Sequence, residues 1–180
     1  METEAGLVAA GEGWFVLNAR EARWRRAEGM GAGMRLEGDT QFPQVGIGIR
    51  LLWPDEPMAM YHWETDQEDF LVLSGEALLI VEGEERPLRQ WDFVHCPAET
   101  KHVIVGAGDS PCTVLAVGAR EHHTVRLPDG TVGGAPDWGA GGRKTAVVPT
   151  LTGLDPSSFD RCRRVSADRM RAVQILAGAL

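Results

Sequence analysis

The chain is acidic and of single-domain size: it has 180 residues, 43% of them hydrophobic, and a formal net charge of −8. An acidic surface repels the phosphates of nucleic acids, and no apolar run approaches the roughly 20 residues that span a bilayer, so we expect neither nucleic-acid nor membrane partners. The acidic N-terminus does not resemble a signal peptide and the three cysteines form no C-x-x-C pair, which favours a cytoplasmic protein with free thiols.

Residues 1–44 are predicted to form a lead-in that packs on the rest of the chain. Residues 14–17 read Trp-Phe-Val-Leu, a composition that favours a first β-strand. The charged segment from Arg20 to Arg26 is predicted to be a short helix or a turn. Glycines between residues 29 and 38 indicate turning backbone, and they do not form the G-x-G-x-x-G pattern of a dinucleotide-binding loop.

Residues 45–119 carry the pattern of a β-barrel or β-sandwich. Short runs rich in β-branched and aromatic residues alternate with turn residues, such as Pro54-Asp55 and Ser74-Gly75. Strands at this close spacing favour an all-β fold over alternating strands and helices. The predicted strands cover residues 45–53, 58–64, 69–73, 77–81, 86–90, 92–96, 102–105 and 113–118.

Residues 120–180 are predicted to be a C-terminal extension of the same domain. Residues 124–127 have the composition of an edge strand, and residues 145–148 that of one more short strand. The tail from Ser166 to Leu180 has apolar residues at helical spacing, with Ser166 as its N-cap. A terminal helix and exposed aromatic residues on a barrel predict a homodimer.

Four polar residues in the central strands indicate a metal site. Strand side chains alternate between two faces, so His62 and Glu64 point the same way, and a turn after Glu64 would bring Glu68 back to that side. His102 opens a later strand and would supply the fourth group. Two buried carboxylates repel each other unless a cation joins them. The predicted ligands of one divalent ion are therefore His62, Glu64, Glu68 and His102, a donor set that suits zinc first, with manganese or iron as alternatives.

These residues give the sequence a resemblance to the cupin family, whose motifs read G-x5-H-x-H-x3,4-E-x6-G and G-x5-P-x-G-x2-H-x3-N. The matching anchors, in order, are His62, Glu68, Gly75, Pro97 and His102. Glu64 replaces the second histidine of the first motif, which makes the site more acidic than the family's usual one. Glu56, Trp91 and Glu99 replace glycines of the motifs, and these changes affect turns rather than ligands.

The resemblance covers roughly residues 45–119 and implies a cupin jelly-roll-like β-barrel. The predicted fold is therefore all-β: a single cupin jelly-roll-like β-barrel with a short N-terminal extension and a C-terminal helix. The resemblance also implies a metal between the two motifs and a small-molecule ligand. The implied function is that of a metal-dependent enzyme of the oxygenase or isomerase type. Two alternatives stay open at this stage: a non-catalytic protein that binds or senses a metal or small ligand, and a barrel without metal in which Glu64 makes only hydrogen bonds.

Overall fold

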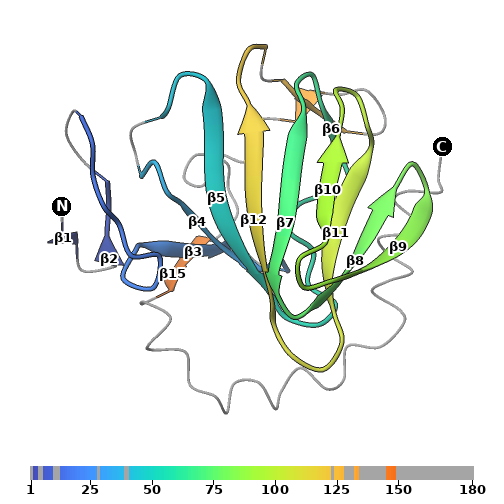
Figure 1. The fold of residues 1–180 in the computed structure, drawn as a ribbon, viewed down its shortest axis with the longest axis horizontal. Helices are drawn as coiled ribbons and strands as arrows, with labels where there is room; N and C mark the ends of the chain where they lie inside the picture. The colour runs from blue at the N-terminus through green and yellow to red at the C-terminus, as the bar shows by residue number, and fades with distance from the viewer. Residues whose placement is uncertain are drawn as a thin grey trace.

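The part of the chain that the computed structural model describes comprises residues 2–3, 6–9, 13–27, 29–38, 41–122, 124–127, 132–133 and 145–148. All regular elements in these ranges are β-strands (Figure 1), so the predicted all-β class is confirmed. Within the same ranges there is no helix long and apolar enough to cross a membrane. The helix predicted from Ser166 to Leu180 lies outside the described residues, and the boundaries at residues 44 and 119 stay a prediction.

The strands are longest in the middle of the chain and short at both ends. They are β1 (Glu2–Thr3), β2 (Gly6–Leu7), β3 (Trp24–Ala27), β4 (Ala32–Arg35), β5 (Val45–Leu52), β6 (Trp63–Glu64), β7 (Glu68–Ser74), β8 (Glu76–Val81), β9 (Glu84–Arg89), β10 (Phe93–Cys96), β11 (His102–Ala107), β12 (Cys112–Ala119), β13 (Val125–Arg126), β14 (Val132–Gly133) and β15 (Thr145–Val148). The long central strands build the barrel, and the short ones extend or close it.

Two sheets enclose the interior of the barrel. The larger sheet has the strand order β10-β7-β12-β5-β4-β3-β15, and the smaller has the order β11-β8-β9. All neighbours in both sheets are antiparallel. In Figure 1 the larger sheet occupies the centre and left of the view, with β8 and β9 at the right. A third sheet, β14-β13-β6, joins the segment after residue 124 to the barrel.

Side chains from both sheets fill the space between them. Phe70, Val72 and Val114 from the larger sheet pack in one cluster with Leu79 and Ile104 from the smaller, and each is at most 6% exposed. Burying an aliphatic or aromatic side chain of this size contributes about 1.5–3 kcal/mol. This cluster therefore holds the two sheets together and fixes which residues face the interior.

The larger sheet carries different residues on its two faces where it continues through β5, β4 and β3. On the outer face, Met34 of β4 belongs to a second buried cluster with Trp24 and Trp53. Successive strand residues point to opposite faces, and paired residues of neighbouring strands point to the same face. Arg35 therefore lies on the inner face, as does Arg50 of β5, which follows the same alternation.

Two predictions for the lead-in are wrong in part or in full. Residues 14–17 form no strand: Trp14 and Val16 are each 90% exposed, and none of the strands in the described part of the chain pairs with this segment to support its β-propensity. The segment from Arg20 to Arg26 begins with a turn, one of the two expected forms, but continues as strand β3, paired with β4. The strand forms because Trp24, 2% exposed, is buried against the sheet.

The strands predicted between residues 45 and 119 are confirmed except in one segment. Residues 58–64 are predicted as one strand, but only Trp63–Glu64 forms one, after an isolated bridge between His62 and His102. The short strands predicted near residues 125 and 146 are present as β13 and β15. Trp91 and Glu99, which replace motif glycines, have left-handed φ angles of 75° and 67°, a conformation that costs roughly 1–2 kcal/mol for a residue with a Cβ.

Candidate metal centre

Three of the predicted ligands meet in the interior of the barrel. His62 directly precedes β6, Glu68 begins β7 and His102 begins β11. Backbone hydrogen bonds run both ways between the histidines, 3.2 Å from His62 N to His102 O and 2.8 Å from His102 N to His62 O. The alternation of β7 places Glu68 on the same inner face as Phe70. Two sheets and one bridge thus bring the three side chains together.

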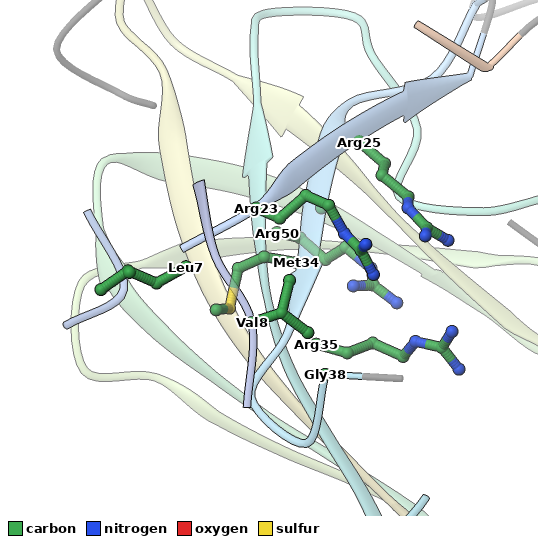
Figure 2. Close-up of a pocket in the computed structure, with 9 residues that line it drawn as sticks. Leu7, Val8, Arg23, Arg25, Met34, Arg35, Gly38 and Arg50 are labelled. Atoms are coloured by element: carbon green, nitrogen blue, oxygen red, sulfur yellow. The ribbon is translucent and has the colours of Figure 1, made fainter. Parts of the chain in front are cut away.

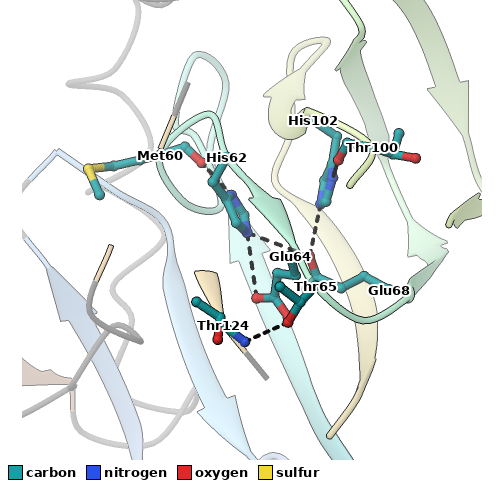
Figure 3. Close-up of polar contacts among 8 residues, drawn as sticks. All are labelled: Met60, His62, Glu64, Thr65, Glu68, Thr100, His102 and Thr124. Atoms are coloured by element: carbon teal, nitrogen blue, oxygen red, sulfur yellow. Dashed lines mark hydrogen bonds and ion pairs between the residues drawn. The ribbon is translucent and has the colours of Figure 1, made fainter. Parts of the chain in front are cut away.

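The candidate ligand atoms lie close enough to share one ion (Figure 3). Glu68 Oε2 is 3.1 Å from His102 Nε2 and 3.5 Å from His62 Nε2. One such atom from each of the three residues falls within 4.8 Å of the other two. His62 and His102 are 7% and 1% exposed, so the group is shielded from bulk water. Two imidazoles and one carboxylate are a ligand set that proteins use for zinc and for non-haem iron.

The backbone fixes which ring nitrogen of each histidine faces the group. His62 Nδ1 lies 2.7 Å from the carbonyl oxygen of Met60, and His102 Nδ1 lies 2.9 Å from that of Thr100. A carbonyl oxygen only accepts, so each Nδ1 carries a hydrogen and donates it. In the neutral ring the lone pair is then on Nε2, the atom nearest Glu68. Histidines that bind metals are commonly oriented by such a hydrogen bond at the other nitrogen.

Two buried atoms of this group have no hydrogen-bond partner in the described part of the chain: Glu68 Oε2 and His102 Nε2. They approach to 3.1 Å, and with His102 neutral they form no hydrogen bond with each other, because neither atom carries a hydrogen. A buried polar atom left without a partner costs about 1–3 kcal/mol. A cation placed between them would satisfy both atoms. The donor set and these two atoms therefore fit a divalent metal ion.

Glu64, the fourth predicted ligand, lies beside the group rather than within it. Its Oε1 is 3.7 Å from His62 Nε2, and the residue is 8% exposed. Figure 3 shows its carboxylate below the His62 ring, next to that of Glu68. The cluster of mutually close ligand atoms comprises only His62, Glu68 and His102. Metal ligation by Glu64 stays a prediction, whereas its position makes the centre acidic.

The pKa values show that this centre attracts positive charge. Burial alone lowers the pKa of His62, but the nearby carboxylates of Glu64 and Glu68 outweigh it and raise that pKa to about 9. Burial also lowers the pKa of His102, and the neighbouring Cys96 and Glu68 raise it to about 10. Burial raises the pKa of Glu68, but His102 and His62 lower it to about 2. Without a metal, both histidines therefore hold an extra proton at pH 7.

Three further residues shape the centre and are not among the predicted ligands. The ring centroid of Phe70 lies 5.3 Å from that of His102, and the buried Cys96 is close enough to His102 to affect its pKa. A Cβ at Gly118 would lie 3.7 Å from Glu68 Cγ and 4.0 Å from Glu64 Oε2, so this glycine borders both carboxylates at ordinary contact distance. The sequence signal for Phe70 is side-chain alternation, because Phe70 is two residues after Glu68 in the same strand. Gly118 has no such signal, because only the pairing of β12 with β7 places it beside Glu68.

Comparison with known protein families gives a match over the central strands. A family model described as a cupin domain matches residues 48–118, a range that contains all four predicted ligands. It begins within β5 and ends within β12, so the lead-in and the C-terminal extension lie outside it. No curated protein matches the chain.

Several solved structures are similar to this one. A sugar phosphate isomerase from Silicibacter pomeroyi is 28% identical with a TM-score of 0.48, and the match covers 55% of this chain and 66% of the isomerase. A cupin 2 conserved barrel domain protein from Salinispora arenicola is 20% identical with a TM-score of 0.49, covering 62% of this chain and 92% of the other. The polyketide cyclase RemF from Streptomyces resistomycificus is 16% identical with a TM-score of 0.54, covering 63% and 84%. At this identity the last likeness concerns the fold alone.

Proposed function

Residues 48–118 form a cupin domain, and from this premise we propose that the protein is a metal-dependent enzyme acting on a small molecule. The proposed ion is divalent, zinc first, with manganese or iron as alternatives. His62, Glu68 and His102 would hold it, and Glu64 would serve as a fourth ligand or as a base. The proposed reaction is of the isomerase or oxygenase type, and the proposed location is the cytoplasm.

The observation that carries the proposal is the set of three converging ligand atoms, two of which are buried without a hydrogen-bond partner among the described residues. Catalytic metal sites commonly have three protein ligands and keep a position for water or substrate, whereas structural zinc sites are closed by four. The charges also fit, because two carboxylates and two neutral imidazoles carry a charge that one divalent ion neutralises. The same set favours the enzyme over a closed binding site.

The residues around the ion would each have a definite task. A bound divalent ion would polarise a carbonyl group or activate a water molecule. The carbonyls of Met60 and Thr100 hold the histidine rings in the orientation that presents Nε2. Glu64, with its Oε1 at 3.7 Å from His62 Nε2, would take up or release a proton at a substrate atom beside the ion. Phe70 would exclude water from one side of the His102 ring.

Metal content tests the proposal directly. The wild-type protein, purified without chelators or a metal-affinity tag, is expected to contain close to one equivalent of zinc, manganese or iron by elemental analysis. His62→Ala and His102→Ala are each expected to lose it. The matched control is His95→Ala, because the His95 side chain is half exposed and bonds to Asp69, outside the group. A wild-type protein that neither contains nor takes up a divalent ion would contradict the proposal.

Cobalt substitution separates an enzyme from the alternative of a non-catalytic binding or sensing protein. An open coordination position accepts azide, so the d–d absorption of the cobalt(II) protein should change when azide is added. An unchanged spectrum means a closed site and favours the binding or sensing role. Once a substrate is identified, turnover that survives both His62→Ala and His102→Ala would contradict metal-dependent catalysis.

The homodimer predicted from the sequence is also part of the proposal. Strand β10 ends the larger sheet in the described part of the chain, and Trp91 and Phe93 next to that edge are 68% and 64% exposed. Exposed aromatic side chains at a sheet edge favour pairing with a second copy of the chain. Light scattering after size-exclusion chromatography checks this, and a monomer at micromolar concentration would contradict it.

A further inference from the structure

A polar pocket that is separate from the metal centre lies over strands β3, β4 and β5 of the larger sheet. Four arginines line it: Arg23 just before β3, Arg25 in β3, Arg35 in β4 and Arg50 in β5. Figure 2 shows their guanidinium groups gathered on one side of the pocket, with apolar side chains on the other. The chain has only 18 lysines and arginines and a net charge of −8, so four cationic side chains around one small pocket are an unusual local concentration.

The register of the sheet brings the arginines together. Arg25 pairs with Gly33 and Gly33 pairs with Arg50, so the three residues form one row across β3, β4 and β5. Arg35 stands in the next row on the same face, opposite Gly48. Neighbouring strands are about 4.8 Å apart and paired residues share a face. The guanidinium groups therefore converge although their residues come from three strands.

Glycines leave the space that the central arginine occupies. A Cβ at Gly33 would lie 2.9 Å from Arg50 Nη1, and a Cβ at Gly48 would lie 3.2 Å from the same atom. The Arg50 guanidinium thus lies across both glycines, against the backbone of the sheet. The enclosed part of the pocket is small, about 20 Å³, which is roughly the space of one water-sized group of atoms.

The charge in the pocket favours an anion. No Asp or Glu is among the described residues that line it. Arg23, Arg25 and Arg50 take part in other contacts as well, and within the group the charge of Arg35 acts against that of Arg50. Burial, and then the repulsion of Arg35, lower the pKa of Arg50 to about 10, while Glu68 acts in the opposite direction. A bound anion would offset both the burial and the repulsion.

We propose that this pocket binds a small oxyanion, namely the phosphate or carboxylate group of a small-molecule ligand. Guanidinium groups bind both kinds of oxyanion through paired, charge-assisted hydrogen bonds. Arg50 and Glu68 lie on the same face of the sheet with only β12 between their strands, and Ala116 and Gly118 there are small. The bound anion would accordingly belong to the substrate of the metal centre, a step that rests on the proposed function.

Calorimetric titration of the full chain tests the pocket without any need for turnover. The metal-stripped protein is titrated with inorganic phosphate and, separately, with succinate, in a buffer free of other oxyanions. We expect one of the two to bind, and Arg35→Gln and Arg25→Gln each to weaken that binding roughly tenfold or more, as expected for losing a charge-assisted hydrogen bond. The matched control is Arg86→Gln on β9, whose side chain is 63% exposed and outside the pocket; its affinity should equal that of the wild type.

Each outcome decides between the two proposals. Equal affinities in Arg35→Gln and Arg86→Gln, or no binding of either anion up to about 10 mM, would overturn the anion pocket. The titrations are repeated after one equivalent of zinc is restored. Anion binding that appears only then, and is lost in His102→Ala but not in Arg35→Gln, would mean that the anion binds the metal ion, and would also overturn the anion pocket. Arginine-dependent binding by a protein that takes up no metal would support the pocket while refuting the metal-dependent function. The stronger of the two anions identifies the ligand group.

Discussion

The inner face of the larger sheet has two halves of opposite charge, and they are built in different ways. Around β7 and β12 it carries Glu68 and meets His62 and His102, which come from segments outside that sheet. Across β3, β4 and β5 it carries arginines that neighbouring strands place side by side. The acidic half therefore depends on two sheets being packed together. The basic half depends only on strand register.

A buried ion pair lies between the two halves. Glu37, 1% exposed, accepts two hydrogen bonds of 2.6 Å from Arg120, which also donates to the carbonyl oxygen of Phe42. A Cβ at Gly46 of β5 would lie 2.9 Å from Arg120 Nη2, so the guanidinium lies directly over Gly46. Gly46 pairs with Gly118 of β12, which in turn pairs with Glu68 of β7. The pair ties the lead-in to the barrel and keeps the Arg120 charge neutralised.

The largest expected effect is on zinc affinity, which should depend on the acidic half of the face and not on the basic half. His102→Ala removes one of three ligands and is expected to lower zinc affinity by roughly 10³-fold or more. Arg35→Gln removes a charge on the same face without removing a ligand, so its zinc affinity should stay within about threefold of the wild type. Competition with a fluorescent chelator measures both. Comparable losses of zinc affinity in the two variants would mean that the arginines also contribute to metal binding.

The ion pair between the halves should matter most for stability. Glu37→Gln leaves Arg120 without its charged partner and is expected to lower the free energy of unfolding by about 3 kcal/mol. Urea denaturation measures the change. The control is Glu84→Gln, since the Glu84–Arg86 pair is exposed on both sides and such pairs contribute about 1 kcal/mol or less. If both variants lose the same stability, the pair does not tie the lead-in to the barrel.

The number of protons released on binding is expected to distinguish zinc binding from anion binding. At pH 7, below pKa values of about 9 and about 10, His62 and His102 hold extra protons that zinc must displace, so about two protons should leave per ion bound. Succinate binding to arginines should release none, because the guanidinium groups stay charged. Calorimetry in buffers of different ionisation enthalpy counts the protons. Release of fewer than one proton with zinc would mean that the histidines titrate near their ordinary value of 6.5.

The same pKa values set a pH dependence for the metal-free protein. The raised pKa values of His62 and His102 stabilise the folded state fully below their ordinary value of 6.5, and this contribution is lost as the pH rises through about 9 and 10. The lowered pKa of Glu68 acts at the other end, where stability is lost as the pH falls from 4.5 towards about 2. Thermal unfolding of the stripped protein should therefore show its midpoint falling between pH 7 and 10. A midpoint that rises over that range would contradict the assignment.

The smallest expected effects come from two glycines, one in each half. Gly33→Ala would place a Cβ 2.9 Å from Arg50 Nη1 and displace this flexible group, so anion affinity should fall several-fold with about 1 kcal/mol or less of stability lost. Gly118→Ala finds its nearest atoms at 3.7 Å or more, an ordinary contact, and should leave anion binding unchanged. Titration of both variants checks this. Equal anion affinity in the two would mean that the Arg50 position does not matter for the pocket.

The sequence predicted the barrel strands and three of the converging site residues because both follow from local patterns. Alternation within a strand and the spacing of two motifs suffice to single out His62, Glu68 and His102. The same reasoning failed for residues 14–17 and for β3, where pairing and burial of neighbouring segments decide the conformation. Ligation by Glu64 stays a prediction: its Oε1 lies 3.7 Å from His62 Nε2, beside the three mutually close ligand atoms.

By itself the sequence determined the all-β class, the acidic character of the centre and the kinds of side chain available to bind a metal. The position of Glu64 beside the group, and the pocket that arginines from β3, β4 and β5 share, are visible only in the folded chain. The physical reason is distance along the chain. Side-chain alternation is a property of a single strand, whereas register and sheet packing depend on contacts between segments far apart in sequence. The basic pocket, which exists only through register, is accordingly visible only in the folded protein.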